Sequence, residues 1–120
     1  MNLAQRKAWW HRLRTICADL EARFPLFLFC DANATMGSVV SQHVSSHGAA
    51  PDNANTPFFA SFLAHRGLYI PSTFEAYHSG KNFTYTPSLK HSKRIDYVAI
   101  PLSIPVCKLS SKVLPIVLSI

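Results

Sequence analysis

Two polar side chains that could do chemistry, Asp31 and Asn33, follow directly on an apolar run at residues 24–30. They stand two positions apart, so on an extended backbone they project in the same direction. In open α/β sheets, ligands and catalytic groups gather at the carboxyl ends of the strands. The pair therefore has the position of a binding or catalytic site. Because Asp and Asn are also common turn formers, a simple turn remains the alternative interpretation at this point.

A second carboxylate, Asp96, lies within the apolar run at residues 95–100. A carboxylate in a buried strand has to be paired or hydrogen-bonded, because its desolvation is otherwise costly. A structural ion pair with Arg94 is one way to satisfy it. A catalytic position is the other, since perturbed carboxylates collect at functional sites. The neighbouring Tyr97 is expected in the core.

The other metal-binding and reactive side chains give weaker indications. His43 and His47 have a spacing that suits zinc on a helix, but Gly and Ser surround them and the glutamate of an HExxH motif is missing. We therefore expect solvated loop histidines there and assign no metal ligand. The three cysteines, Cys17, Cys30 and Cys107, are odd in number and lack CxxC spacing, which favours buried reduced thiols.

The composition indicates the class of protein and the kind of partner. A chain of 120 residues with 48% hydrophobic and 15% charged residues is expected to fold as a single domain. Its net charge of +6 favours an anionic partner such as nucleic acid or another phosphate ester, although the basic residues are scattered. No secretory signal is evident, and no apolar stretch approaches the ~20 residues of a membrane span. We expect a soluble, intracellular protein without membrane contact, with the choice between nucleus and cytoplasm left open.

Hydrophobic periodicity predicts the elements that position these groups, beginning with a helix over residues 3–24. Asn2 can cap this helix, with Gln5 in capping-box spacing. A core-facing stripe recurs at helical intervals and consists of Trp9, Leu13, Ile16, Cys17, Leu20 and Phe24. Packing of Trp9 and Trp10 is the main interpretation, and stacking on nucleic acid is the alternative.

Short strands and a second helix are predicted further along the chain. The apolar run at residues 24–30 is typical of a central, fully buried strand. A polar loop follows, and Thr56 at the N-cap with Pro57 at N1 begins a helix that stops at Gly67. The remaining predictions are strands at residues 68–70, 83–86 and 95–100, a loop at 72–81, and edge strands within 106–120.

Five short motifs occur in one order along the chain, namely Asp31-Ala32-Asn33-Ala34, Asn53-Ala54-Asn55-Thr56, Ser72-Thr73-Phe74, Thr84-Tyr85 and Arg94-Ile95-Asp96-Tyr97-Val98. In this order and spacing the chain resembles the C-terminal half of an endonuclease/exonuclease/phosphatase (DNase I-like) domain. It is most similar to the endonuclease domains of non-LTR retrotransposons, which accompany reverse transcriptases. The resemblance covers residues 24–100.

The resemblance implies an α/β fold, the four-layer α/β sandwich of DNase I-like proteins. Residues 1–120 would form about half of that domain, with one mixed sheet plus helices. The chemistry of the family is Mg²⁺-dependent phosphodiester hydrolysis, so the resemblance implies Mg²⁺ as cofactor and DNA as partner. Half of such a sandwich would leave one inner sheet face exposed, and self-association through that face is expected.

The resemblance also implies roles for individual residues. Asp31 would position or deprotonate the attacking water, and Asn33 would contact the scissile phosphate. Asp96 would orient a catalytic histidine, as a triad carboxylate orients its imidazole. Asn55 and Thr84 would line the substrate groove. These roles suit in-line attack, which needs a base for water and charge neutralisation on the phosphate oxygens.

Two parts of the family's active site have no match in this chain. One is the metal-binding glutamate of the family's N-terminal half, since neither Glu21 nor Glu75 stands in that context. The other is the histidine of the closing S-D-H motif, because no Asp or His follows Asp96. We therefore expect the isolated chain to be inactive. The alternatives are a non-catalytic remnant that binds nucleic acid or a protein partner, and a phosphomonoesterase of the same fold.

Overall fold

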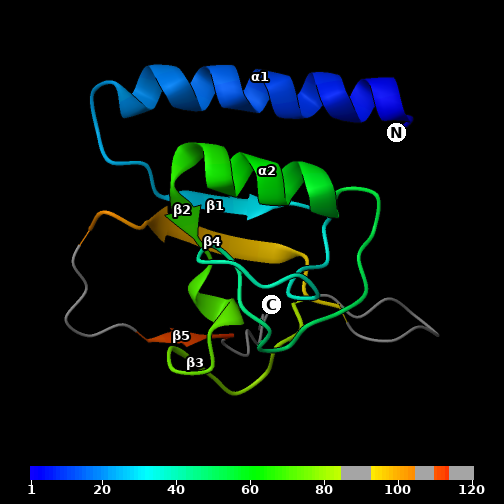
Figure 1. Cartoon of the computed structure of the whole chain (residues 1–120), viewed down its shortest axis with the longest axis vertical. Helices are drawn as coiled ribbons and strands as arrows, with labels where there is room; N and C mark the ends of the chain where they lie inside the picture. The colour runs from blue at the N-terminus through cyan, green and yellow to red at the C-terminus, as the bar shows by residue number, and fades with distance from the viewer. Residues whose placement is uncertain (85–92, 105–109, 114–120) are drawn as a thin grey trace, which may run out of the picture.

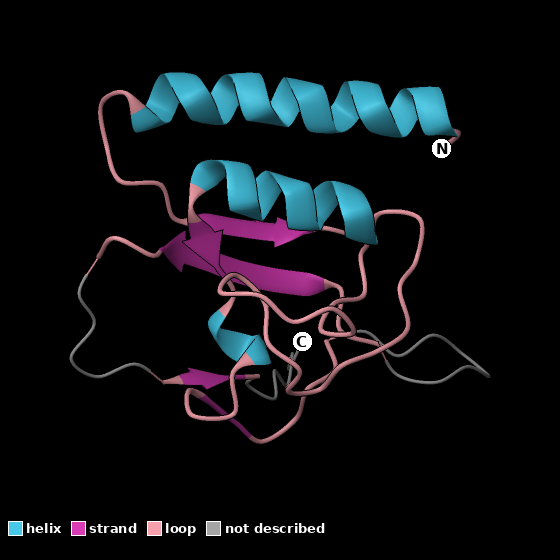
Figure 2. Cartoon of the chain, in the orientation of Figure 1, coloured by secondary structure: helices cyan, strands magenta, loops and turns pink. Residues whose placement is uncertain are grey.

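The computed structural model describes residues 1–84, 93–104 and 110–113. The elements in this part of the chain are α1 (Leu3–Glu21), β1 (Leu28–Asp31), α2 (Thr56–Arg66), β2 (Leu68–Tyr69), the 3-10 helix η1 (Pro71–Thr73), β3 (His78–Ser79), β4 (Asp96–Pro101) and β5 (Ser111–Lys112). Figure 2 shows both α-helices on the same side of the strands. The expected α/β class is confirmed.

Within the described residues, the strands form two small sheets in place of the predicted single mixed sheet. β4 lies between β1 and β2 in an antiparallel sheet, and β3 pairs with β5 in parallel. Figure 1 shows the β3–β5 pair apart from the β1–β4 pair, on the side away from the helices. The prediction was wrong because β3 and β5 are very short and far apart in sequence, so hydrophobic periodicity could not reveal their pairing.

The helices form a layer above the β1–β4 pair, with α2 between α1 and the sheet (Figure 1). Aromatic rings join these layers. The ring centroid of Phe59 on α2 lies 5.5 Å from that of Trp10 on α1 and 5.4 Å from that of Tyr97 on β4. All three side chains are buried, so the expectation that Tyr97 belongs to the core is confirmed.

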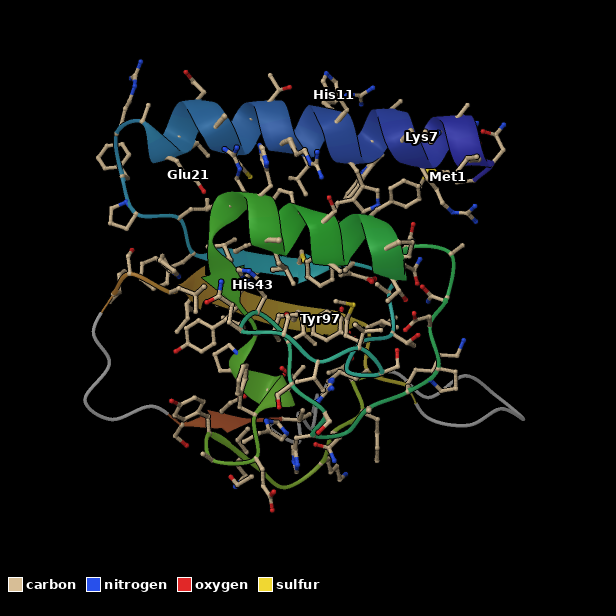
Figure 3. All side chains as sticks on the ribbon, in the orientation of Figure 1. Met1, Lys7, His11, Glu21, His43 and Tyr97 are labelled. Carbon is tan, nitrogen blue, oxygen red and sulfur yellow. The ribbon has the colours of Figure 1, made fainter. Side chains whose placement is uncertain are left out.

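Two polar contacts fix α1 along α2. The Arg14 guanidinium donates to Ser61 Oγ at 2.7 Å, and Arg66 Nη1 forms an ion pair with Glu21 Oε2 at 3.2 Å. Figure 3 shows Glu21 between the two helices.

Neither described helix combines the length and the apolar character that crossing a membrane needs.

Helix α1 begins as predicted but turns a different face to the core. Asn2 and Gln5 form the capping box, with Asn2 Oδ1 accepting from the Gln5 N–H at 2.8 Å. Trp10 is 4% exposed and Trp9 is 38% exposed, so the prediction that the Trp9 side faces the core is wrong. Because α1 packs mainly against α2, only a narrow face is covered. Of the rest of the predicted stripe, Cys17 is buried and Leu13 is half-buried as expected, while Ile16, Leu20 and Phe24 are exposed.

The prediction of a fully buried central strand at residues 24–30 is also wrong. β1 lies at the edge of the described sheet, and its side chains alternate between half-buried and exposed. Phe29 is 75% exposed, and Val98, its partner on β4, is exposed as well. The reason is that the helices cover only one side of this sheet. We define the open face as the uncovered side, which carries Phe29, Asp31, Asp96 and Val98.

Helix α2 has nearly the predicted bounds. Asn55 is the N-cap residue in place of Thr56, and Pro57 lies in the first turn. Gly67 is the C-cap, with a left-handed φ of 65° that glycine adopts without strain. The strand expected after it is confirmed as β2.

Parts of three predictions fall outside the described residues. Of the strand predicted at residues 83–86, residues 85 and 86 are not described, and Thr84 lies in a bend. Cys107 is not described. Of the tail at residues 106–120, the structure describes 110–113, which include β5.

The histidines of the polar loop, predicted to be solvated, are only partly exposed. His43 is half-buried (Figure 3), and its Nδ1 lies 2.7 Å from the carbonyl oxygen of Leu68. His47 is also half-buried, with its ring centroid 5.7 Å from that of His78. Within residues 1–84, 93–104 and 110–113, no group of three or more His, Cys, Asp or Glu side chains is placed to hold a metal ion.

Candidate active site

The two carboxylates that sequence analysis selected, Asp31 and Asp96, lie directly opposite one another in the β1–β4 pair. Asp31 ends β1 and Asp96 begins β4, so the antiparallel arrangement brings them to the same end of the sheet. Just beyond them, the Ala32 N–H donates to the Ile95 carbonyl at 2.9 Å. This bond makes Asp31 and Asp96 a non-hydrogen-bonded pair, in which the Cα atoms are about 4.5 Å apart and the side chains approach closely.

The electrostatics of this pair are unfavourable. Both side chains are exposed on the open face, so the desolvation expected for Asp96 does not arise. In the part of the chain that the structure describes, no basic side chain forms an ion pair with either carboxylate. Like charges directly opposite one another in a sheet repel. The surrounding fold therefore holds Asp31 and Asp96 together against their repulsion.

The predicted ion pair between Asp96 and Arg94 is wrong, because the Arg94 guanidinium binds backbone carbonyls. Nη1 donates to the Ser72 carbonyl at 2.9 Å, and Nη2 donates to the His47 carbonyl at 2.9 Å. Burial lowers the pKa of Arg94, and the nearby Tyr97 acts in the opposite direction. Arg94 therefore joins η1 and the preceding loop to the start of β4.

The open face forms one wall of a cavity of about 660 Å³. Asp31, Asp96 and Thr84 line this cavity, and Phe29 and Val98 add apolar surface. A few polar groups on mostly apolar walls are the usual composition of a ligand site. Three of the five residues that sequence analysis selected are thus brought together.

Thr84 reaches the cavity because its own side chain fixes it to the start of β4. Its Oγ1 accepts from the backbone N–H groups of Ile95 and Asp96, both at 3.1 Å. Its backbone N–H donates to the Lys93 carbonyl at 2.7 Å. Thr84 thus lines the cavity, and its contact with a substrate stays a prediction.

Asn33 and Asn55 are not among the residues that line the cavity. Asn33 has a left-handed φ of 50°, and its N–H donates to Asp31 Oδ1 at 3.0 Å. Its carbonyl accepts from the side-chain amides of Asn53 at 3.0 Å and Asn55 at 3.3 Å. Asp31 therefore caps a turn as well as lining the cavity, and the two interpretations of that residue are compatible. Asn55 ties the start of α2 to the loop after β1.

Two cavity-lining residues, His78 and Ser111, were missed by sequence analysis. They are opposite one another in the β3–β5 pair, with Ser111 Oγ 2.9 Å from His78 Nδ1. Their segments were predicted as loop and tail, and no motif or spacing links them. Only the tertiary pairing reveals the contact.

Comparison of the chain with protein-family models, curated proteins and solved structures gives no significant match. The family suggested by the five motifs therefore stays a prediction.

The facing carboxylates predict that neutralising either one stabilises the fold when divalent cations are absent. Asp31→Asn and Asp96→Asn should each raise the free energy of unfolding in EDTA by about 0.2–1 kcal/mol, because each removes the repulsion. Asp31→Asn retains the Oδ1 that accepts from the Asn33 N–H. Urea unfolding measures the change, and Asp19→Asn on α1 controls for net charge. Destabilisation by both variants would contradict this account of the pair.

Buried Tyr97 and half-buried Cys30, on neighbouring strands, lead us to predict a loss of stability at alkaline pH. Burial raises the pKa of the Tyr97 hydroxyl to about 12, and burial together with Asp31 and Asp96 raises the pKa of the Cys30 thiol to about 12. Both groups are uncharged when protonated. The ordinary pKa is 9.0 for Cys and 10.0 for Tyr, so the unfolded chain releases these protons at a pH where the folded chain still retains them.

Their stabilising contribution is therefore complete below pH 9 and decreases as the pH rises toward 12. Urea midpoints measured between pH 8 and pH 11 should fall, and the fall should be smaller in Cys30→Ala. Equal pH dependence in the variant and the wild-type protein would show that the thiol does not contribute.

Proposed function

We propose that this chain carries part of the active site of a Mg²⁺-dependent phosphodiester hydrolase of the endonuclease type found in non-LTR retrotransposons. The observation that carries the proposal is the juxtaposition of Asp31 and Asp96 beside a cavity on the open face. The net charge of +6 supports an anionic substrate such as DNA. The five ordered motifs supply the choice of reaction.

The donor set on the open face fits Mg²⁺. This ion is commonly held by one or two carboxylates, retains several waters and shares phosphate oxygens with the substrate. Asp31 and Asp96 would be those carboxylates, and a cation between them would offset their repulsion. When bound, Mg²⁺ supplies Lewis-acid stabilisation of the charge that develops on the phosphoryl oxygens.

The residues of the chain have separate tasks in this proposal. One oxygen of Asp31 accepts from the Asn33 N–H, so the other oxygen would both contact the ion and orient the attacking water beside it, whose proton it would take. Thr84, fixed to the backbone of Asp96, positions the substrate from the adjacent wall. Both nitrogens of His78 are engaged by Ser111 and Lys81, so this histidine is not available to Asp96, and in this proposal Asp96 serves as a ligand of the ion.

One observation favours a non-catalytic alternative. The described residues bring only two carboxylates to the cavity, and no group of three or more His, Cys, Asp or Glu side chains among them is placed to hold a metal ion. Two ligands hold Mg²⁺ weakly, so we expect the isolated chain to turn over slowly at best. A basic remnant that binds nucleic acid, or a protein partner, without cleavage is therefore the second candidate.

A plasmid assay separates these candidates. Supercoiled DNA is incubated with the chain, with and without Mg²⁺, while DNA binding is measured at several salt concentrations. The proposal predicts slow, Mg²⁺-dependent nicking that falls at least ~10-fold in Asp31→Asn and in Asp96→Asn, since each removes a catalytic charge. Asp19→Asn should nick like the wild-type protein.

The other outcomes identify the alternatives. Salt-dependent binding that neither Mg²⁺ nor Asp31→Asn alters would overturn the catalytic proposal and support the remnant. Turnover of a phosphomonoester such as an inositol phosphate, without nicking, would assign the same cavity to a phosphomonoesterase.

Self-association through the open face is a further part of the proposal. Phe29 and Val98 expose apolar surface next to the edge strand β1, and such surfaces favour association. Sedimentation velocity should show a mean mass that rises with concentration, and Phe29→Ser should reduce this rise. Val39→Ser, which removes an equally exposed side chain from a loop, should not. A sharp monomer at every concentration would refute the prediction.

A further inference from the structure

The His78 imidazole is held in one tautomer by its surroundings. The ring is 6% exposed, and Nε2 lies 2.7 Å from the carbonyl oxygen of Lys81. A carbonyl oxygen only accepts, so Nε2 must carry the proton of the neutral ring. Nδ1 is then the unprotonated nitrogen, and it accepts from the Ser111 hydroxyl at 2.9 Å.

Backbone pairing keeps this serine against the imidazole. Ser111 is the register partner of His78 in the β3–β5 pair, and its N–H donates to the Tyr77 carbonyl at 2.6 Å. The His47 ring packs on the His78 ring with centroids 5.7 Å apart. A hydroxyl, a base and a third group that orients the base are the components of an activated nucleophile, with the Lys81 carbonyl as the orienting group.

The hydroxyl also has space for a substrate beside it. Ser111 and His78 line the cavity of about 660 Å³, whose wall includes Phe29, Pro71 and Ile100. We propose that Ser111 is a nucleophile activated by His78 and that it accepts acyl groups from carboxylic esters with a short apolar acyl chain. This acyl-transfer activity needs no metal ion, so it does not depend on the phosphodiesterase proposal.

The reaction balances with the groups present. Ser111 Oγ attacks the ester carbonyl carbon while His78 Nδ1 takes the hydroxyl proton. The bond from that carbon to the alcohol oxygen breaks, and the alcohol leaves with the proton from Nδ1. Water then attacks the acyl-serine with the same base, which releases the carboxylic acid and restores the Ser111 hydroxyl.

The test uses a fluorophosphonate probe on the full chain in EDTA. The serine oxygen displaces fluoride from phosphorus, so a reacted chain gains the mass of the phosphonyl group, and peptide mapping locates it. We expect labelling at Ser111, loss of labelling in Ser111→Ala, and unchanged labelling in Ser79→Ala, whose exposed serine follows His78 and does not line the cavity. Hydrolysis of a short-chain nitrophenyl ester should follow the same pattern.

The variant His78→Gln tests the base. Its side-chain amide can still donate to the Lys81 carbonyl but cannot take a proton, so labelling should slow at least ~100-fold. A circular dichroism spectrum like that of the wild-type protein shows that the fold is retained. If this variant does not fold, the comparison of Ser111→Ala with Ser79→Ala decides, since ordinary serines do not react with the probe.

Three results would overturn the proposal: no labelling of the wild-type chain, labelling confined to residues other than Ser111, and an unchanged labelling rate in folded His78→Gln. Labelling in EDTA without plasmid nicking would support this inference and leave the phosphodiesterase proposal without support. Nicking without labelling would support the phosphodiesterase proposal and overturn this inference. The failure of one proposal can therefore be told from the failure of the other.

Discussion

The register of β1 against β4 is the constraint on which the candidate site depends. Side chains of a strand alternate between its two faces, so a slip of one residue would turn Asp31 toward the helices and Cys30 toward the open face. The core opposes that slip. Tyr97, opposite Cys30, packs its ring against Phe59, and its hydroxyl lies 2.7 Å from the Ala34 carbonyl. A carboxylate moved into that position would lose its hydration without a partner, which costs several kcal/mol.

Arg94 and Thr84 lie near the two carboxylates but bind backbone groups. They therefore leave the negative charges of Asp31 and Asp96 unneutralised. Arg94 binds the carbonyls of Ser72 and His47, although a carboxylate is the usual partner of a buried guanidinium. Thr84 holds the start of β4 by accepting two backbone N–H groups. The start of β4 is thus fixed while Asp31 and Asp96 remain available to a cation or a substrate. Because backbone contacts hold the strand, the like-charged pair can persist in a small domain without an ion pair from the described residues to either carboxylate.

Some of the fold could be predicted because local chemistry decides it. The capping box at Asn2, the stop at Gly67 and the strand that contains Asp96 all follow from residue type and spacing. The convergence of Asp31 and Asp96 was also predictable, but only from the order of the motifs. Hydrophobic periodicity by itself places no strand beside another.

Other features could not be predicted because they depend on what each face contacts. A run such as residues 24–30 is apolar on both sides, so it predicts burial, yet here only one side has a layer of helices to cover it. Arg94 stands two residues from Asp96, which suggested an ion pair, but the loop carbonyls that it binds come from elsewhere in the chain. The contact between His78 and Ser111 joins segments with no periodicity of their own.

The most direct test of the central claim is a measurement of the β1–β4 register by nuclear Overhauser effects in solution. In a non-hydrogen-bonded antiparallel pair the Hα atoms of opposite residues point toward one another. The account predicts strong Hα–Hα effects between Asp31 and Asp96 and between Phe29 and Val98. Strong effects between Cys30 and Asp96, or none between the two strands, would contradict the register and with it the site.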